Sequence, residues 1–162
     1  MKHSILSSML TAGVMAISTA AHAEVEVQWW HAMGGANGER VDKIAADFNK
    51  TQSEYKIVPT YKGNYTETMT AAIAGFRAKQ HPHIVQVFEV GTATMMAAKG
   101  AIKPMYEVMS DAGANFDPDG FIGPVKGYYT TTSGEMLSMP YNSSTPVLWV
   151  NRDAFKKAGL NP

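Results

Sequence analysis

The stretch that decides the fold is Val25-Glu26-Val27-Gln28-Trp29, in which apolar and polar side chains alternate. A period of two predicts a β-strand with one half-buried face. A glycine-rich turn follows over residues 34–38, in which we expect Asn37 to cap a helix. Beyond it, apolar residues recur at the spacing of one helix face: Val41, Ile44, Ala45 and Phe48. The chain therefore begins with a strand, a turn and an amphipathic helix.

The same alternation of elements continues along the chain. Tyr55, Ile57 and Tyr61 predict a second strand, and Pro59 confines it to a sheet edge or to a strand end. Asn64 is expected to cap a second helix. Apolar residues at helical spacing mark its inner face: Met69, Ala72, Ile73 and Phe76. The apolar run over residues 84–88 predicts a third strand that is covered on both faces.

The second half gives weaker signals. An Ala/Met-rich helix is expected from Thr92 to Gly100, and residues 111–127 should be mostly loop with short helix. Two further strands are expected over residues 136–141 and 146–150, followed by a helix that Asp153 caps and Gly159 ends. Strands that alternate with helices over short connections predict an α/β fold, a layered sheet with flanking helices and right-handed crossovers.

The composition excludes several classes of protein. The 162 residues contain 14 Lys+Arg, 14 Asp+Glu and no cysteine, and the basic residues form no run. Nucleic-acid binding requires a clustered basic surplus, so we expect no nucleic-acid partner. Without cysteine there is no disulfide scaffold, and the core must be held by burial alone. The length fits one domain better than two.

The first 23 residues have the organisation of an export signal. Lys2 supplies a basic start, residues 4–21 carry no charge, and Ala21-His22-Ala23 offers small residues where a signal peptidase cuts. We expect cleavage before Glu24 and a folded part over residues 24–162. A transmembrane anchor is the weaker alternative, because Ser and Thr interrupt a run that is short for a membrane span.

In open α/β sheets, ligands bind outside the carboxyl ends of the strands. Five residues follow predicted strands at that edge: Trp30, His31, Tyr65, Glu89 and Ser144. A carboxylate, hydroxyls and an aromatic wall suit a polyol, because the carboxylate accepts two hydroxyl hydrogen bonds and the ring covers the C–H side. Each residue also has a structural alternative: core packing for the tryptophan, an ordinary turn around Ser144, and an inward helix position for Tyr65.

Enzyme signatures are weak. Ser143 and Ser144 lie in no Gly-x-Ser-x-Gly elbow. His81 and His83 could join Glu89 in a zinc-dependent phosphoesterase, but two ligands separated by a proline are more typical of a solvated loop. We therefore expect no metal, no cofactor and no catalytic activity.

Several longer stretches carry a family resemblance. Residues 55–65, 87–97, 142–148 and 151–160 resemble the family 1 extracellular solute-binding proteins, which include maltose-binding protein. The resemblance implies a lobe of the type II periplasmic-binding-protein fold in a monomeric periplasmic protein that delivers its ligand to the membrane permease of an ABC importer. Within the family, these stretches are most similar to members that bind sn-glycerol 3-phosphate, with glycerophosphodiesters as a further ligand class. An oligosaccharide is the alternative ligand within the same family.

The resemblance also assigns roles to three positions. It implies that Tyr65 contacts the ligand, that Glu89 holds the glycerol hydroxyls and that Ser144 hydrogen-bonds the ligand. Trp30 and His31 are expected to form a secondary ligand wall on separate grounds, because they end the first predicted strand. Family members have two lobes, so we expect residues 24–162 to be a truncated first lobe and the main phosphate contacts to lie in a second lobe absent from this chain.

Overall fold

The computed structural model describes residues 23–98 and 100–161. The expected export signal therefore lies outside the described residues, apart from Ala23. The chain divides into two compact units, Met1–Gln86 and Val87–Pro162.

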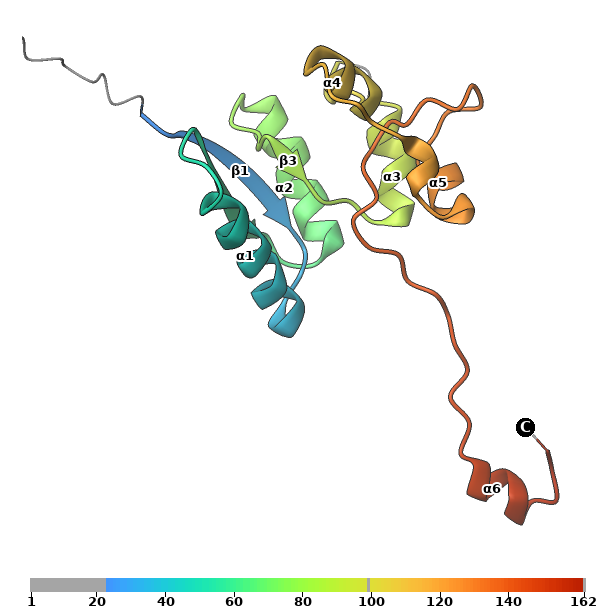
Figure 1. The fold of residues 1–162 in the computed structure, drawn as a ribbon. Coiled ribbons are helices and arrows are strands. Elements are labelled where there is room, and N and C mark those ends of the chain that lie inside the picture. Colours follow the sequence, from blue (N-terminus) through green and yellow to red (C-terminus); the bar gives the residue numbers. More distant parts are fainter. Residues whose placement is uncertain (1–22, 99, 162) are drawn as a thin grey trace, which may run out of the picture. The chain divides into compact units, whose positions relative to one another are not determined.

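The first unit is built on a parallel sheet of three strands, shown in Figure 1. The strands are β1 (Val25–His31), β2 (Tyr55–Tyr61) and β3 (Ile84–Val85), in the order β2-β1-β3. β1 pairs with β2 along its whole length, so that His31 lies opposite Tyr61, whereas β3 pairs only with Trp29 and Trp30. The predicted strands 1 and 2 and the edge position of Pro59 are confirmed. The predicted third strand is shorter than expected, since β3 ends at Val85, and the prediction that it is covered on both faces is wrong, because Ile84 is exposed.

Two helices connect these strands, α1 (Gly35–Asn49) and α2 (Tyr65–Arg77), and they lie on either side of β1 in Figure 1. The chain moves outward from β1 to β2 and then returns past β1 to β3. Right-handed crossovers in opposite directions place the two helices on opposite faces of the sheet. The reversal makes the boundary between β1 and β3 the topological switch point, where ligands of open α/β sheets bind.

Helix α1 differs from the prediction at its start. Gly34 is the N-cap and the helix begins at Gly35, whose φ is +53°. The prediction that Asn37 is the cap is wrong, since Asn37 lies inside the first turn and accepts a hydrogen bond from Arg40 at 2.8 Å. Val41 and Ala45 are buried as expected, but Ile44 and Phe48 are exposed. The buried face is therefore narrower than the apolar spacing suggests.

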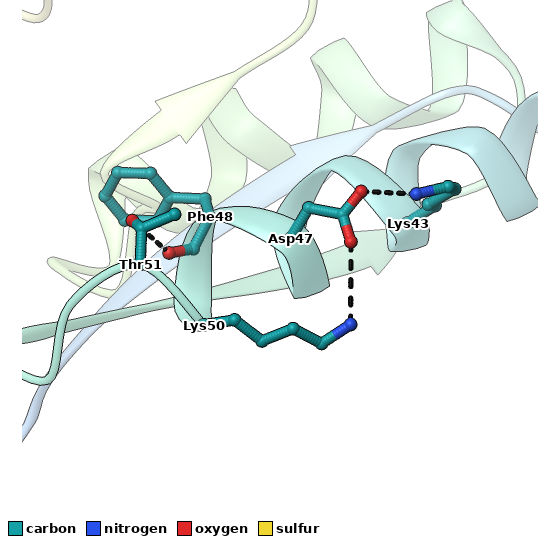
Figure 2. A network of polar contacts seen from close by, with 5 residues as sticks. All are labelled: Lys43, Asp47, Phe48, Lys50 and Thr51. Carbon is teal, nitrogen blue, oxygen red and sulfur yellow. Dashed lines mark hydrogen bonds and ion pairs between the residues drawn. The ribbon is translucent and has the colours of Figure 1, made fainter.

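The last turn of α1 carries a small polar network, shown in Figure 2. The Asp47 carboxylate pairs with Lys43 one turn before it and lies 3.5 Å from the Lys50 ammonium. The Thr51 hydroxyl donates to the Phe48 carbonyl at 2.7 Å and closes the helix end. The hydrogen bond from Lys43 holds the pKa of Asp47 below its ordinary value, and both lysines add to the effect.

Helix α2 begins as predicted, with Asn64 as N-cap. Its buried positions are Thr68 and Ala72, while Phe76 on the predicted inner face is exposed. Of the four apolar residues expected to face inward, Ala72 alone is classed as buried.

The regular structure in the described part of the second unit consists mostly of short helices. It contains α3 (Glu89–Met96), α4 (Met105–Asp111), a 3₁₀ turn (Pro118–Gly120), α5 (Gly123–Tyr128) and α6 (Arg152–Lys157). The helix expected from Thr92 thus begins three residues earlier, at Glu89. The cap of α6 is Asn151, whose side chain accepts from the Ala154 amide at 3.0 Å, so the prediction for Asp153 is wrong. Gly159 ends this helix as expected, with a φ of +71°.

The strands predicted over residues 136–141 and 146–150 are wrong for the described chain. Only an isolated bridge between Thr130 and Met136 forms there. Residues 141–150 have no regular structure, and Leu148 and Trp149 are 87% and 91% exposed. Their composition favours a strand, but a strand also needs a hydrogen-bonding neighbour, which the described residues do not supply. Within residues 23–98 and 100–161, no helix has the length and apolarity that a membrane crossing requires.

Candidate functional site

His31 ends β1 at the carboxyl edge of the sheet and is only 2% exposed. Its carbonyl accepts hydrogen bonds from the Lys62 amide at 3.0 Å and from the Thr68 hydroxyl at 3.4 Å. Its Nδ1 accepts from the Met33 amide at 3.3 Å, which places the proton of the neutral ring on Nε2. Burial lowers the pKa of His31, and the nearby Asp42 carboxylate partly opposes this shift. His31 thus joins the ends of β1 and β2 to the first turn of α2.

An open hollow of about 410 Å³ lies beside His31, at the start of α1. Its polar lining includes His31, Tyr61 and the carboxylates Glu39 and Asp42, and the rest is Met33 and the glycine turn. Gly38 is required here because a Cβ would lie 2.8 Å from the Met33 carbonyl oxygen. The hollow can offer hydrogen-bond acceptors, and none of the described residues that line it is Lys or Arg.

Trp30, the other residue of the predicted aromatic wall, is half-buried. The Lys62 ammonium lies 4.1 Å from its ring centroid, a cation–π contact. On α2, Gly75 comes close enough that an added Cβ would be 3.3 Å from the ring. The indole therefore has packing partners of its own, and a ligand contact for Trp30 or His31 stays a prediction.

Tyr65 is the first residue of α2 and is half-buried. Two residues on either side of Tyr65, Asn64 and Glu67, form a capping box. The Asn64 side chain accepts from the Glu67 amide at 3.0 Å, and the Glu67 carboxylate accepts from the Asn64 amide at 2.7 Å. These two bonds satisfy backbone donors that a helix start otherwise leaves open. Asn64 was expected as the cap, whereas the partner role of Glu67 was not foreseen, although the Asn-x-x-Glu spacing signals it.

Gln86 closes the first unit at the boundary between β1 and β3. Its amide donates to the Trp30 carbonyl at 2.9 Å, and its side-chain oxygen accepts from the Ala32 amide at 3.1 Å. The side chain is buried, and its Nε2 has no hydrogen-bond partner among the residues that the structure describes. Sequence reasoning missed this residue, although a lone amide inside the apolar run of residues 84–88 is the signal that could have found it.

Glu89 and Ser144 belong to the second unit. Glu89 is the first residue of α3 rather than the residue after a strand, and the Thr92 hydroxyl donates to the Phe88 carbonyl at 2.8 Å in the same turn. Ser144 is exposed in the irregular segment before α6. The structure thus brings together Trp30, His31 and the turn before Tyr65. The ligand roles of Tyr65, Glu89 and Ser144 stay predictions.

The histidines of the alternative zinc site have other contacts. His83 Nδ1 accepts from the Gln28 amide at 3.0 Å, and the His81 ring lies 5.8 Å from that of Phe76. Within the described part of the chain, no three His, Cys, Asp or Glu residues are grouped so as to hold a metal ion.

Known proteins resemble this chain in sequence. A sequence model of the family described as "Bacterial extracellular solute-binding protein" matches residues 35–162. The sn-glycerol-3-phosphate-binding periplasmic protein UgpB of Brucella abortus is 52% identical over 97% of this chain. Its counterparts in Pectobacterium atrosepticum and Rhizobium meliloti are 52% and 49% identical over 99% and 96% of it. The chain spans 36% of the length of each of these three relatives.

Solved structures share the fold at low sequence identity. CpMnBP1 with mannotriose bound superimposes with a TM-score of 0.59 and 20% identity over 85% of this chain and 34% of its own. An ABC substrate-binding protein from Listeria monocytogenes gives a TM-score of 0.57 and 14% identity over 86% of this chain and 34% of its own. The expected fold class, an α/β fold of the substrate-binding-protein type, is confirmed.

Proposed function

Because the chain belongs to the family of bacterial extracellular solute-binding proteins, we propose that it is part of a periplasmic protein that binds sn-glycerol 3-phosphate for an ABC importer. The observation that carries this proposal is the identity of about one half, over nearly the whole chain, to relatives named for that ligand. The proposal includes glycerophosphodiesters as a further ligand class.

The proposed protein is exported. Residues 1–23 act as a signal peptide that is removed before Glu24, and the rest works in the periplasm as a monomer. No bond is made or broken: two lobes close around the ligand, and the closed form is recognised by the membrane permease. Residues 24–162 form the N-terminal lobe in this proposal, and the main phosphate contacts come from the other lobe.

Three residues of this chain contact the ligand in the proposed complex. The Glu89 carboxylate accepts hydrogen bonds from the glycerol hydroxyls, Tyr65 covers and orients the ligand, and the Ser144 hydroxyl donates to it. The place of Tyr65 at the carboxyl end of β2 supports its role, because that edge is where open α/β sheets bind ligands. Trp30 and His31, which end β1, lie at the same edge.

The test is calorimetric titration of the complete product of the gene that encodes this chain. We expect heat of binding with sn-glycerol 3-phosphate and none with maltose; the reverse result would identify an oligosaccharide-binding protein instead. Glu89→Ala should cost about 2 kcal/mol or more of binding free energy, the scale of a hydrogen bond to a charged group. The matched control is Glu54→Ala, which removes an exposed carboxylate just before β2, at the opposite end of the strand from Tyr65. Equal affinities for the two variants would remove Glu89 from the site.

A further inference from the structure

The backbone of Tyr65 is enclosed by two hydrogen bonds. Asn64 immediately precedes it, and Glu67 follows two positions later. The bond from the Glu67 amide to the Asn64 side chain and the bond from the Asn64 amide to the Glu67 carboxylate, at 3.0 and 2.7 Å, close a ring that contains Tyr65. The first turn of a helix frays readily when its donors are unsatisfied, so these bonds fix the conformation of Tyr65.

Gly63 makes room for this arrangement. Its φ is +91°, a conformation that favours glycine, and a Cβ at this position would lie 2.0 Å from Glu67 Oε2. The Glu67 carboxylate therefore occupies space that any other residue at position 63 would fill. The glycine and the capping box depend on each other.

The enclosed turn is also attached to the sheet. The His31 carbonyl at the end of β1 accepts from the Lys62 amide at 3.0 Å, two residues before the cap. It also accepts from the hydroxyl of Thr68, which is fully buried, at 3.4 Å. Tyr65 thus lies between two points at which the turn is joined to β1.

We propose that Asn64 and Glu67 are positioning residues for ligand binding, which act by holding Tyr65 in its binding position at the carboxyl edge of the sheet. The inference rests on the proposed function and extends it to two residues that are bonded to each other around the backbone of Tyr65. Loss of a capping side chain shifts the equilibrium toward the frayed turn by about fivefold. Because only the intact turn presents Tyr65, the apparent dissociation constant rises as the intact fraction falls, by up to the same factor.

The test compares four variants of the complete gene product by titration with sn-glycerol 3-phosphate. Glu67→Ala opens the box, whereas Glu67→Gln retains an oxygen that can accept from the Asn64 amide. Thr66→Ala is the matched control, because it truncates an exposed side chain of the same turn that takes no part in the box. Tyr65→Ala reports whether Tyr65 contributes to binding. Hydrogen exchange over residues 64–68 gives an independent measure of fraying.

We expect Glu67→Ala to bind more weakly, by up to about fivefold, and to exchange faster at residues 64–68. Glu67→Gln and Thr66→Ala should keep the affinity of the parent protein. If Tyr65→Ala weakens binding but Glu67→Ala does not, the inference is overturned and the proposed function still stands. This holds whatever the hydrogen-exchange rate of Glu67→Ala. Equal weakening in Glu67→Gln and Glu67→Ala also overturns it, since charge would then be responsible. If the parent protein binds no sn-glycerol 3-phosphate, the proposed function fails, and the inference fails with it.

Discussion

The side-chain oxygen of Gln86 accepts a hydrogen bond from the Ala32 amide at 3.1 Å, and this bond joins the residue after β3 to the residue after β1. β3 contributes only two residues to the sheet. The Gln86 side chain therefore continues the connection between β1 and β3 beyond the last strand pairing, at the topological switch point. The backbone amide of Gln86 donates to the Trp30 carbonyl, which gives a second hydrogen bond between these two segments.

Gln86→Met should lower the free energy of unfolding of the complete gene product by up to about 1 kcal/mol, because the Ala32 amide loses its acceptor while removal of the buried, unpartnered Nε2 offsets part of that loss. The side chain keeps its approximate volume, so little cavity is created. Urea denaturation measures the change. Gln80→Met, at an exposed position after α2, is the control. Equal stability of the two variants would show that the Gln86 bond contributes nothing.

Gly63→Ala should destabilise the protein by about 2 kcal/mol and Gly35→Ala by about 1 kcal/mol, because both glycines have positive φ but only Gly63 faces the capping box. Among the described residues, no atom beyond the chain neighbours and the backbone of α1 lies within 4 Å of a Cβ at Gly35, so backbone strain is the main cost there. In a protein that already carries Glu67→Ala, the cost of Gly63→Ala should fall toward that of Gly35→Ala. Strictly additive changes in the free energy of unfolding, measured by urea denaturation, would show that Gly63 and Glu67 act independently.

His31 should make stability depend on pH. Burial lowers the pKa of His31 below the ordinary value of 6.5. As the pH falls, the unfolded chain therefore takes up a proton at a higher pH than the folded protein does. The contribution of His31 is therefore complete above pH 6.5 and is lost as the pH falls through the lowered folded-state pKa. His31→Gln should lose this part of the pH dependence of the urea midpoint.

Asp42→Asn provides a second variant for the same measurement. The Asp42 carboxylate raises the pKa of His31, in opposition to burial. Its removal should lower that pKa further and steepen the loss of stability in acid. A pH profile of Asp42→Asn that is flatter than that of the parent protein would contradict this assignment.

Zinc and chelators should leave the melting temperature unchanged. His83 Nδ1 is already hydrogen-bonded to the Gln28 amide, and a proline separates His83 from His81. A ligand that binds only the folded state raises the melting temperature by mass action, so a tight site would be evident. One zinc ion per purified chain, together with turnover of a phosphate ester, would instead support a phosphoesterase.

The sequence predicts the first unit well because its strands carry their own signals. The alternation from Val25 to Trp29, the edge proline and the Asn64 cap are all local features, and the structure contains each of them. The prediction misplaces the start of α1 because Asn37 is a stronger cap by type than Gly34, whereas the positive φ of Gly35 fixes the helix start three residues earlier.

The second unit shows where local signals fail. Val147, Leu148 and Trp149 favour a strand by type, but residue type does not supply the neighbouring strand that completes the hydrogen bonds. Glu89 was expected after a strand of five residues and instead begins α3, because β3 ends at Val85. The buried amide of Gln86 and the Glu67 bond to Asn64 depend on contacts that apolar spacing does not encode.

The edge position of Pro59 determines the direction in which the sheet can grow. β2 is the outer strand on its side, and Pro59 has no amide hydrogen to offer a further strand. Lys56 in the same strand adds an exposed charge. A strand that approaches β2, from this chain or from a neighbouring molecule, therefore meets a missing donor at Pro59. Extension of the sheet is directed to the side of β3, and the β2 side is protected against edge-to-edge aggregation.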